Sequence, residues 1–396
     1  MARFSKSGVS PLPGSLDGDE AWGALVRRRR LRVAALLLLA LALSLSLLCF
    51  AGWGGSAYPG AYAYRVFAPG EAARALTVLA RDAVDGIIRP LAVPSGSVRL
   101  ASYPAYFTVA SRIPIVLVTV LCGAMVGVSG LLYQVAFRNP VANAGMVGAS
   151  SGAQLGFAAL VLMQSSGAVT TAWTRYELAF GGGCLALLAA LGIGRLIGAR
   201  TAGTSLLILI GGMMFAQLIK VVVSYLTLYV MDPVEYQAFY MASQVIEPDA
   251  SGAGLAVAAC TAALSLLPVA ALRGRMGGLL VGDDDEARML GVDAGRMRAV
   301  AVVAGGLMMV CASVAVGEVA LVGLLAPFLG RRVLGMRFSD QLIGSALTGC
   351  ILLLACRLLV DAVPVPGGAA LGLACSAIAL PLFVLLVSND LRGWGR

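Results

Sequence analysis

Apolar runs long enough to cross a membrane recur along the whole chain. The first follows Arg32 and ends at Ala51. As a helix rising 1.5 Å per residue, its about 20 residues would span roughly 30 Å, the hydrocarbon core of a bilayer. Only 12% of the residues are charged and 59% are hydrophobic, whereas about a quarter of a soluble domain is charged. Because lipid cannot satisfy backbone polar groups, such runs predict an all-α, polytopic membrane protein.

Further runs bring the expected number of transmembrane helices to about ten. The segment at 320–335 is short and contains Pro327, which is typical of a half-helix. The other runs lie at about 113–137, 144–163, 178–197, 204–230, 252–272, 299–318, 341–360 and 369–388. A signal peptide is the alternative for the first run. Its apolar region would be only about 7–15 residues long, so we expect a retained helix.

Arginines at the ends of these runs predict the topology. Residues 1–30 form a polar tail that ends in an arginine cluster, and positive charge before a first span favours the cytoplasm. We expect residues 31–396 to form the membrane domain. Because successive spans cross in opposite directions, ten spans place both termini in the cytoplasm. The same alternation places residues 52–111 outside the cell and residues 273–298 in the cytoplasm. In residues 70–89 the apolar residues recur at helical spacing, which predicts an amphipathic helix. This helix would lie on the membrane surface or form a docking surface for an external partner.

The composition argues against several kinds of active site. The chain has no histidine, and none of its eight cysteines forms a C-x-x-C pair, so we expect neither a metal site nor a bound cofactor. A P-loop needs a lysine after a glycine-rich turn, and neither Lys6 nor Lys220 has that setting. Transport energy would therefore come from a partner ATPase or from an ion gradient. Arginines at span ends explain the net charge of +9 better than nucleic-acid binding does.

The stretch from Arg112 to Gly156 joins two apolar segments through a polar, proline-containing turn at 138–140. Glycines recur at helical spacing on both sides of the turn, and small residues let helix backbones approach closely in lipid. They are Gly123, Gly127, Gly130, Gly145, Gly148, Gly152 and Gly156. The pattern predicts a helical hairpin packed inside a bundle.

The same stretch resembles the permeases of type II ABC importers, the FecCD family, which carry iron-siderophores, haem or cobalamin. The matches are spread over the whole family signature, and the resemblance continues over residues 112–390. The matching residues are Arg112, Pro114, Ser129, Gly130, Gln134, Phe137, Asn139, Pro140, Ala142, Gly145, Gly148, Ser150, Gly152 and Ala153. The resemblance implies the helical fold of these permeases.

Residues 273–298 carry dense charges of both signs and no run long enough to span. By themselves they fit a solvated loop. The resemblance implies instead two short coupling helices that sit in a groove of an ATPase, and rigid helices could transmit the motion of that partner. The residues that match the family in this segment are Asp284, Ala287, Leu290, Gly291 and Val292.

The resemblance also implies a cytoplasmic gate. It would be lined by Asn139 and Val141 in the polar turn, and by Thr204 and Ser205 at the start of the fifth span. Short polar residues at a helix start are also ordinary N-caps, so both interpretations of the Thr–Ser pair remain open.

The fifth span lines the translocation pathway in the family, and it carries Met213, Met214, Gln217 and Lys220. Lys220 lies roughly 22 Å from the inner end of that helix. Its ammonium would either extend to the interface or face a watery cavity, where it could attract an anionic chelate. Glu318 stands where the family usually has an apolar residue. An acid inside the membrane suggests a functional role, unless it lies at the external boundary and is simply solvated.

Arg112 and Arg357 are candidates for docking an extracellular binding protein. In the cobalamin permeases that this chain resembles, arginines of the permease contact glutamates of the binding protein. The charge pattern is only partly present, since Ile115 and Val360 stand where the family has arginine. Docking could use Arg99 or the 70–89 helix instead.

Together these features predict the permease subunit of an ATP-driven importer in the cell membrane, which is a transporter and not an enzyme. The resemblance implies a second permease, identical or different, two ATPase subunits that use ATP and Mg²⁺, and an extracellular substrate-binding protein. The expected cargo is an iron chelate, with ferric siderophore ahead of haem and haem ahead of cobalamin. An ion-coupled secondary transporter using Glu318, Asp361 or Lys220 is the alternative, although no inverted repeat is evident. A structural membrane subunit is a weaker one.

Overall fold

The computed structural model describes residues 18–51, 65–66, 104–198, 204–244, 253–280, 284–289, 291–362 and 371–393. Within these ranges the chain is a bundle of helices, and the strands β1 (Phe50–Ala51) and β2 (Arg65–Val66) form one short antiparallel pair. The longer helices are α1 (Gly18–Cys49), α4 (Pro104–Phe137), α5 (Ala149–Ser165), α6 (Ala172–Gly198), α7 (Thr204–Tyr225), α8 (Pro233–Gln244), α9 (Ala253–Ala271), α12 (Ala294–Val316), α13 (Ala320–Leu334), α14 (Phe338–Ala362) and α15 (Leu371–Gly393). The prediction of an all-α polytopic fold is confirmed.

Each predicted apolar run coincides with one of these helices, but the helices differ in length. Six are long and apolar enough to cross a membrane, and a seventh span results if α9 and the bent segment after it are counted together. With 17 residues in α5 and 15 in α13, these two helices are shorter. The number of about ten spans is therefore approximate, and α13 is the segment expected to be a half-helix.

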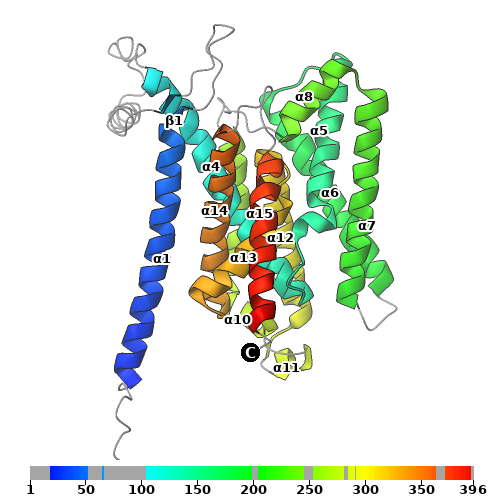
Figure 1. Ribbon diagram of the computed structural model, residues 1–396. Coiled ribbons are helices and arrows are strands. Elements are labelled where there is room, and N and C mark those ends of the chain that lie inside the picture. Colours follow the sequence, from blue (N-terminus) through cyan, green and yellow to red (C-terminus); the bar gives the residue numbers. More distant parts are fainter. Residues whose placement is uncertain are drawn as a thin grey trace, which may run out of the picture.

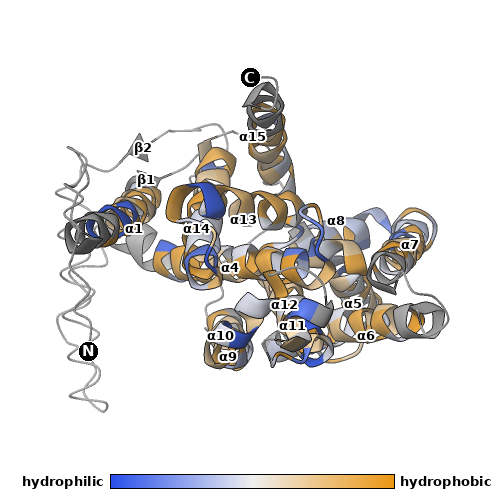
Figure 2. Ribbon diagram, turned by 90° about the horizontal axis from the view of Figure 1, so that it is seen from below, coloured by the Kyte–Doolittle hydropathy of each residue, from blue (hydrophilic) through white to orange (hydrophobic). Residues whose placement is uncertain are grey.

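Helix α4 forms the centre of the bundle and packs against α12, α13 and α14 (Figures 1 and 2). The close packing depends on its glycines, because a Cβ built on Gly127 or Gly130 would overlap the backbone carbonyl of Ser345 or Gly323. Most residues in the transmembrane part of α4 are buried inside the protein. The predicted small-residue helices are thus buried in the bundle, but they do not pack as a hairpin, because α5 packs mainly against α6 and not against α4.

Helix α1 stands at the periphery and contacts mainly α14 (Figure 1). It begins at Gly18, so the later part of the predicted N-terminal tail, residues 18–30, is helical, and the cytoplasmic assignment of the tail stays a prediction. Arginine, leucine and alanine favour helix, and the helix therefore extends back through the cluster at Arg27–Arg32. The guanidinium of Arg32 donates a 2.9 Å hydrogen bond to the carbonyl of Val333, and Arg29 forms an ion pair with Asp340.

The two ends of the bundle differ in what they carry. Short helices α10 (Arg273–Gly277) and α11 (Asp284–Met289), joined by the 3-10 turn η3 (Gly278–Leu280), lie at the end where α1 begins and α15 finishes (Figure 1). Helix α8 lies at the opposite end. We call these ends the α11 side and the α8 side. The shared side of α11, the α1 start and the α15 end agrees with the predicted topology, and the cytoplasmic assignment itself stays a prediction.

Most of the predicted external segment 52–111, including the helix expected at 70–89 and Arg99, lies outside the described residues. Its last residues, 104–111, already belong to α4.

Candidate functional site

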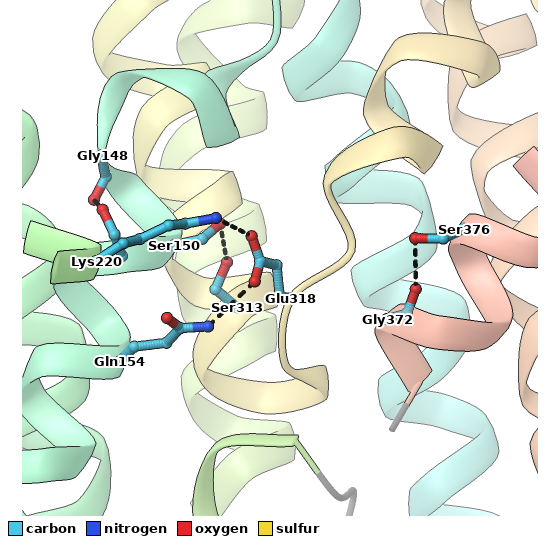
Figure 3. A network of polar contacts seen from close by, with 9 residues as sticks. Gly148, Ser150, Gln154, Lys220, Ser313, Glu318, Gly372 and Ser376 are labelled. Carbon is cyan, nitrogen blue, oxygen red and sulfur yellow. Dashed lines mark hydrogen bonds and ion pairs between the residues drawn. The ribbon is translucent and has the colours of Figure 1, made fainter. Parts of the chain in front are cut away.

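An ion pair inside the bundle joins two residues that the sequence singled out separately. Lys220 in α7 places its Nζ 2.7 Å from Oε1 of Glu318, which lies in the short link between α12 and α13 (Figure 3). The amide Nε2 of Gln154 in α5 donates a 3.2 Å hydrogen bond to Oε2 of the same carboxylate. Three separate parts of the chain therefore meet at Glu318. Gln154 was missed by the sequence reasoning, although an amide in a run of small and apolar residues is itself a signal.

The pair lies deep in the bundle, measured from the α11 side. Lys220 is about 24 Å above the start of α7 at Thr204, and Glu318 lies just before α13, whose length is about 22 Å. Both distances place the pair in the half of a roughly 30 Å bilayer core that is nearer the α8 side. A charge inside a membrane without a partner is costly, and the ion pair reduces that cost. Lys220 therefore points to Glu318 rather than simply to the interface.

A second polar contact fixes the helices that carry this site. The hydroxyl groups of Ser150 in α5 and Ser313 in α12 lie 2.8 Å apart and are buried (Figure 3). Ser150 is one helical turn before Gln154, and Ser313 is in the last turn of α12 before Glu318. Hydrogen bonds between membrane helices set their register. The serine contact thus positions the Gln154 amide opposite the Glu318 carboxylate.

The face of α7 next to the ion pair is exposed in this chain. Met213 and Met214 are 41% and 71% exposed, and Gln217 is also exposed. The side chain of Lys220 is 41% exposed and that of Glu318 is 30% exposed. The pathway candidates therefore occupy one accessible side of α7, with the ion pair at its border with the core.

The predicted gate residues lie at the α11 side, where α4 turns toward α5. Oδ1 of Asn139 accepts a 3.0 Å hydrogen bond from the amide of Val141, and this bond closes the turn around the proline between them. Val141 is 44% exposed. Thr204 and Ser205 begin α7, but their side chains lie outside the described part of the protein. The gate stays a prediction, as does the N-cap alternative.

The predicted coupling segment forms α10, η3 and α11, with a closed C-terminal cap after α11. Gly291 adopts a left-handed conformation with φ 73°, and the amide of Val292 donates a 3.0 Å hydrogen bond to the carbonyl of Ala287. This bond across a left-handed glycine is the Schellman arrangement that ends helices. Ala287 and Val292 are buried, which anchors this segment to the bundle. Asp284 begins α11, its side chain lies outside the described residues, and Leu290 lies wholly outside them.

The two predicted docking arginines share one carboxylate. Asp361 lies 3.3 Å from Nη1 of Arg112 and 3.0 Å from Nη2 of Arg357, and Arg112 also donates a 2.8 Å hydrogen bond to the carbonyl of Leu47. The three charged side chains are only 10–16% exposed. We call Arg112, Arg357 and Asp361 the Asp361 cluster. This cluster links α1, α4 and α14 at the α8 side. The docking role stays a prediction, and the geometry supplies a structural role.

Comparison with known proteins agrees with this architecture. A sequence model of the FecCD transport family matches residues 84–389. The Fe(3+) dicitrate transport system permease protein FecC of Escherichia coli is 32% identical over 288 residues, which cover 70% of this chain and 81% of that protein. The hemin transport system permease protein HmuU of Yersinia pestis is 29% identical over 279 residues, or 70% of this chain and 81% of that protein.

A solved structure supports the fold independently. It shows an inward-facing conformation of a metal-chelate type ABC transporter, with a TM-score of 0.66 and 19% identity, and the match covers 91% of this chain and 99% of that one. The family match spans most of the helical bundle, including the ion pair, the turn after α4 and the segment around α11. The chain therefore belongs to the FecCD transport family and is a multi-pass membrane transport permease.

Proposed function

We propose that this chain is the transmembrane subunit of an ATP-driven importer that moves an iron chelate from an external binding protein into the cytoplasm. The single observation that carries the proposal is the capped knob α10–η3–α11, which is anchored in a bundle of this family and lies at the end where α1 begins and α15 finishes. The relatives named above are permeases for ferric dicitrate and hemin. Ferric siderophore is the first candidate cargo, followed by haem and then cobalamin.

The energy would come from partner subunits. Neither Lys6 nor Lys220 follows the glycine-rich turn of a P-loop. Two separate ATPase subunits would therefore bind ATP and Mg²⁺, and this chain would bind no cofactor of its own. A second permease, identical or different, would complete the pathway along the exposed face of α7. Rotation of the ATPases pushes the knob as a rigid body, and the packed helices transmit the movement to the pathway.

Transport measured in proteoliposomes tests this proposal. The permease is reconstituted with its ATPase and its binding protein, and uptake of radioactive ferric siderophore, haem and cobalamin is measured. We expect uptake of one of them that requires ATP and is stopped by vanadate. An ATPase without its P-loop lysine is the control. Uptake that continues without ATP but collapses with a protonophore would overturn the proposal in favour of ion coupling.

The glycine cap of α11 provides a sharper test. Proline fixes φ near −65° and has no amide hydrogen, so Gly291→Pro cannot keep the left-handed cap. We expect this variant to insert normally and to lose ATP-driven uptake. Gly291→Asn is the matched control, because asparagine tolerates the left-handed conformation, and it should retain most of the uptake. Normal uptake by Gly291→Pro would contradict the coupling role.

A further inference from the structure

We propose that Lys220, held by Glu318, is a contact site for a negatively charged oxygen group of the transported chelate. This inference rests on the proposed function and adds the chemical class of the cargo. The site would lie in the half of the pathway nearer the α8 side. Its ligand would be an anionic, oxygen-rich iron chelate whose carboxylate or catecholate oxygen accepts hydrogen bonds from the ammonium.

The ammonium of Lys220 has more hydrogen-bond donors than its bond to Glu318 uses. A lysine side chain carries three N–H donors and no acceptor. Among the residues that the structure describes, Glu318 is the hydrogen-bond partner of Lys220. With 41% of the side chain exposed, the remaining donors are accessible from the open face of α7. The cationic member of the pair is thus the one that can still bind a ligand.

The carboxylate, by contrast, is held in place without Lys220. Gln154 donates to its second oxygen at 3.2 Å, and the serine contact between α5 and α12 fixes that amide. Glu318 also directly precedes the N-terminal end of α13, where the helix dipole favours a negative charge. When Lys220 turns toward a ligand, Glu318 therefore keeps favourable partners. The flexible lysine can exchange one oxygen for another.

The surroundings of Lys220 on α7 suit such a ligand. Gln217 and Ser224 stand three residues before and four residues after Lys220, so all three lie on one stripe of the helix, and both neighbours are exposed. An amide and a hydroxyl supply neutral hydrogen bonds beside the single cation. Because Glu318 neutralises the lysine, the stripe attracts an anion only weakly, and a transported group can leave again.

Uptake selectivity tests the inference in the reconstituted importer. The probes are ferric citrate and haem, which carry carboxylates, and a neutral ferric trihydroxamate, and the readout is the ratio of kcat/KM for anionic and neutral probes. We expect Lys220→Met to lower this ratio about tenfold, since a hydrogen bond to a charged group is lost. Lys220→Arg keeps the cation and should keep the ratio. Ser376→Ala, on the far helix α15, is the control for a general loss of activity.

The charge-reversed double variant Lys220→Glu/Glu318→Lys separates binding from a purely structural role. It keeps an ion pair between α7 and the link before α13 but moves the cation to the anchored position. We expect normal folding and a ratio as low as that of Lys220→Met. A wild-type ratio in the double variant, or in Lys220→Met, would overturn the inference and leave only a structural pair. Absence of ATP-dependent uptake of ferric siderophores, haem and cobalamin alike by the wild-type importer would instead overturn the proposed function.

Discussion

The Asp361 cluster at the α8 side and the Lys220–Glu318 pair are both built around one carboxylate, but they differ in how far their side chains are exposed. The side chains of Arg112, Arg357 and Asp361 are 10–16% exposed, whereas Lys220 and Glu318 are 41% and 30% exposed. The cluster connects α1, α4 and α14, which pack closely together. The pair connects the core to the open face of α7. Similar charges therefore serve packing in one place and remain available to a ligand in the other.

The physical reason for the difference is desolvation. Charges removed from solvent depend on one another, so that loss of one partner strands the others. Charges that remain partly exposed are screened and depend on each other only weakly. The comparison can therefore be tested by removing single groups and measuring stability.

The largest effect is expected for Asp361→Asn. The substitution leaves two nearly buried guanidinium groups next to each other without their carboxylate, which costs about 3–5 kcal/mol. The Tm of the detergent-solubilised protein, followed by size-exclusion chromatography, should fall sharply. Lys220→Met serves as the comparison and should lower Tm much less. Equal Tm values for both variants would show that the two sites do not differ.

Arg112→Gln should have a smaller effect, because the Arg357–Asp361 pair remains. The hydrogen bonds of Arg112 to Asp361 and to the Leu47 carbonyl are lost, and hydrogen bonds to charged groups contribute about 1.5–3 kcal/mol. The measurement combines Tm with the affinity of the external binding protein. A lower Tm supports the structural role. An unchanged Tm with weaker binding would instead support the docking prediction.

Glu318→Gln sharpens the other half of the comparison. Both partners are about a third exposed or more, so the stability cost should be at most about 1 kcal/mol. The same Tm measurement applies, and its control is the Asp361→Asn variant. A decrease as large as that of Asp361→Asn would mean that the Lys220 site is closed to ligands.

The smallest effect is expected for Ser313→Ala, which removes the 2.8 Å contact with Ser150. Hydrogen bonds between membrane helices average about 0.6 kcal/mol. Ser376→Ala is a matched control, because its hydroxyl bonds to Gly372 within the same helix (Figure 3). We expect Ser313→Ala to lower Tm slightly more than Ser376→Ala. No difference between them would argue against a role of the serine contact in holding α5 against α12.

Much of the fold could be predicted from the sequence because lipid imposes simple rules. Apolar length predicted the helices, and the glycines of α4 predicted where backbones meet, as Gly127 does with Ser345 and Gly130 with Gly323. The start of the first helix, α1, was less well predicted, because this helix continues back to Gly18. A charged segment has no apolar pattern to mark its start, so local helix preference alone decided that boundary.

The candidate site was only half predictable. Lys220 and Glu318 stood out as charges in apolar surroundings, and Arg112 and Arg357 through the family resemblance. Which of these charges pair with each other was not predictable, because 98 residues separate Lys220 from Glu318 and 249 separate Arg112 from Asp361. Gln154 is a polar residue in an apolar run, but it carries no charge, and only the structure shows its contact with Glu318.

The sequence by itself determined that this chain is a helical membrane protein, because long apolar runs leave the backbone no other way to satisfy its polar groups in lipid. Its resemblance to a known family, and not its apolar pattern, indicated a permease. Only the tertiary structure decided which charge meets which. Packing of α5 against both α7 and α12 brings Gln154 and Lys220 to Glu318, and packing of α4 against α14 places Asp361 between two arginines. Which charges pair depends on the distance between helices in space, and the separation of two residues along the chain does not give that distance.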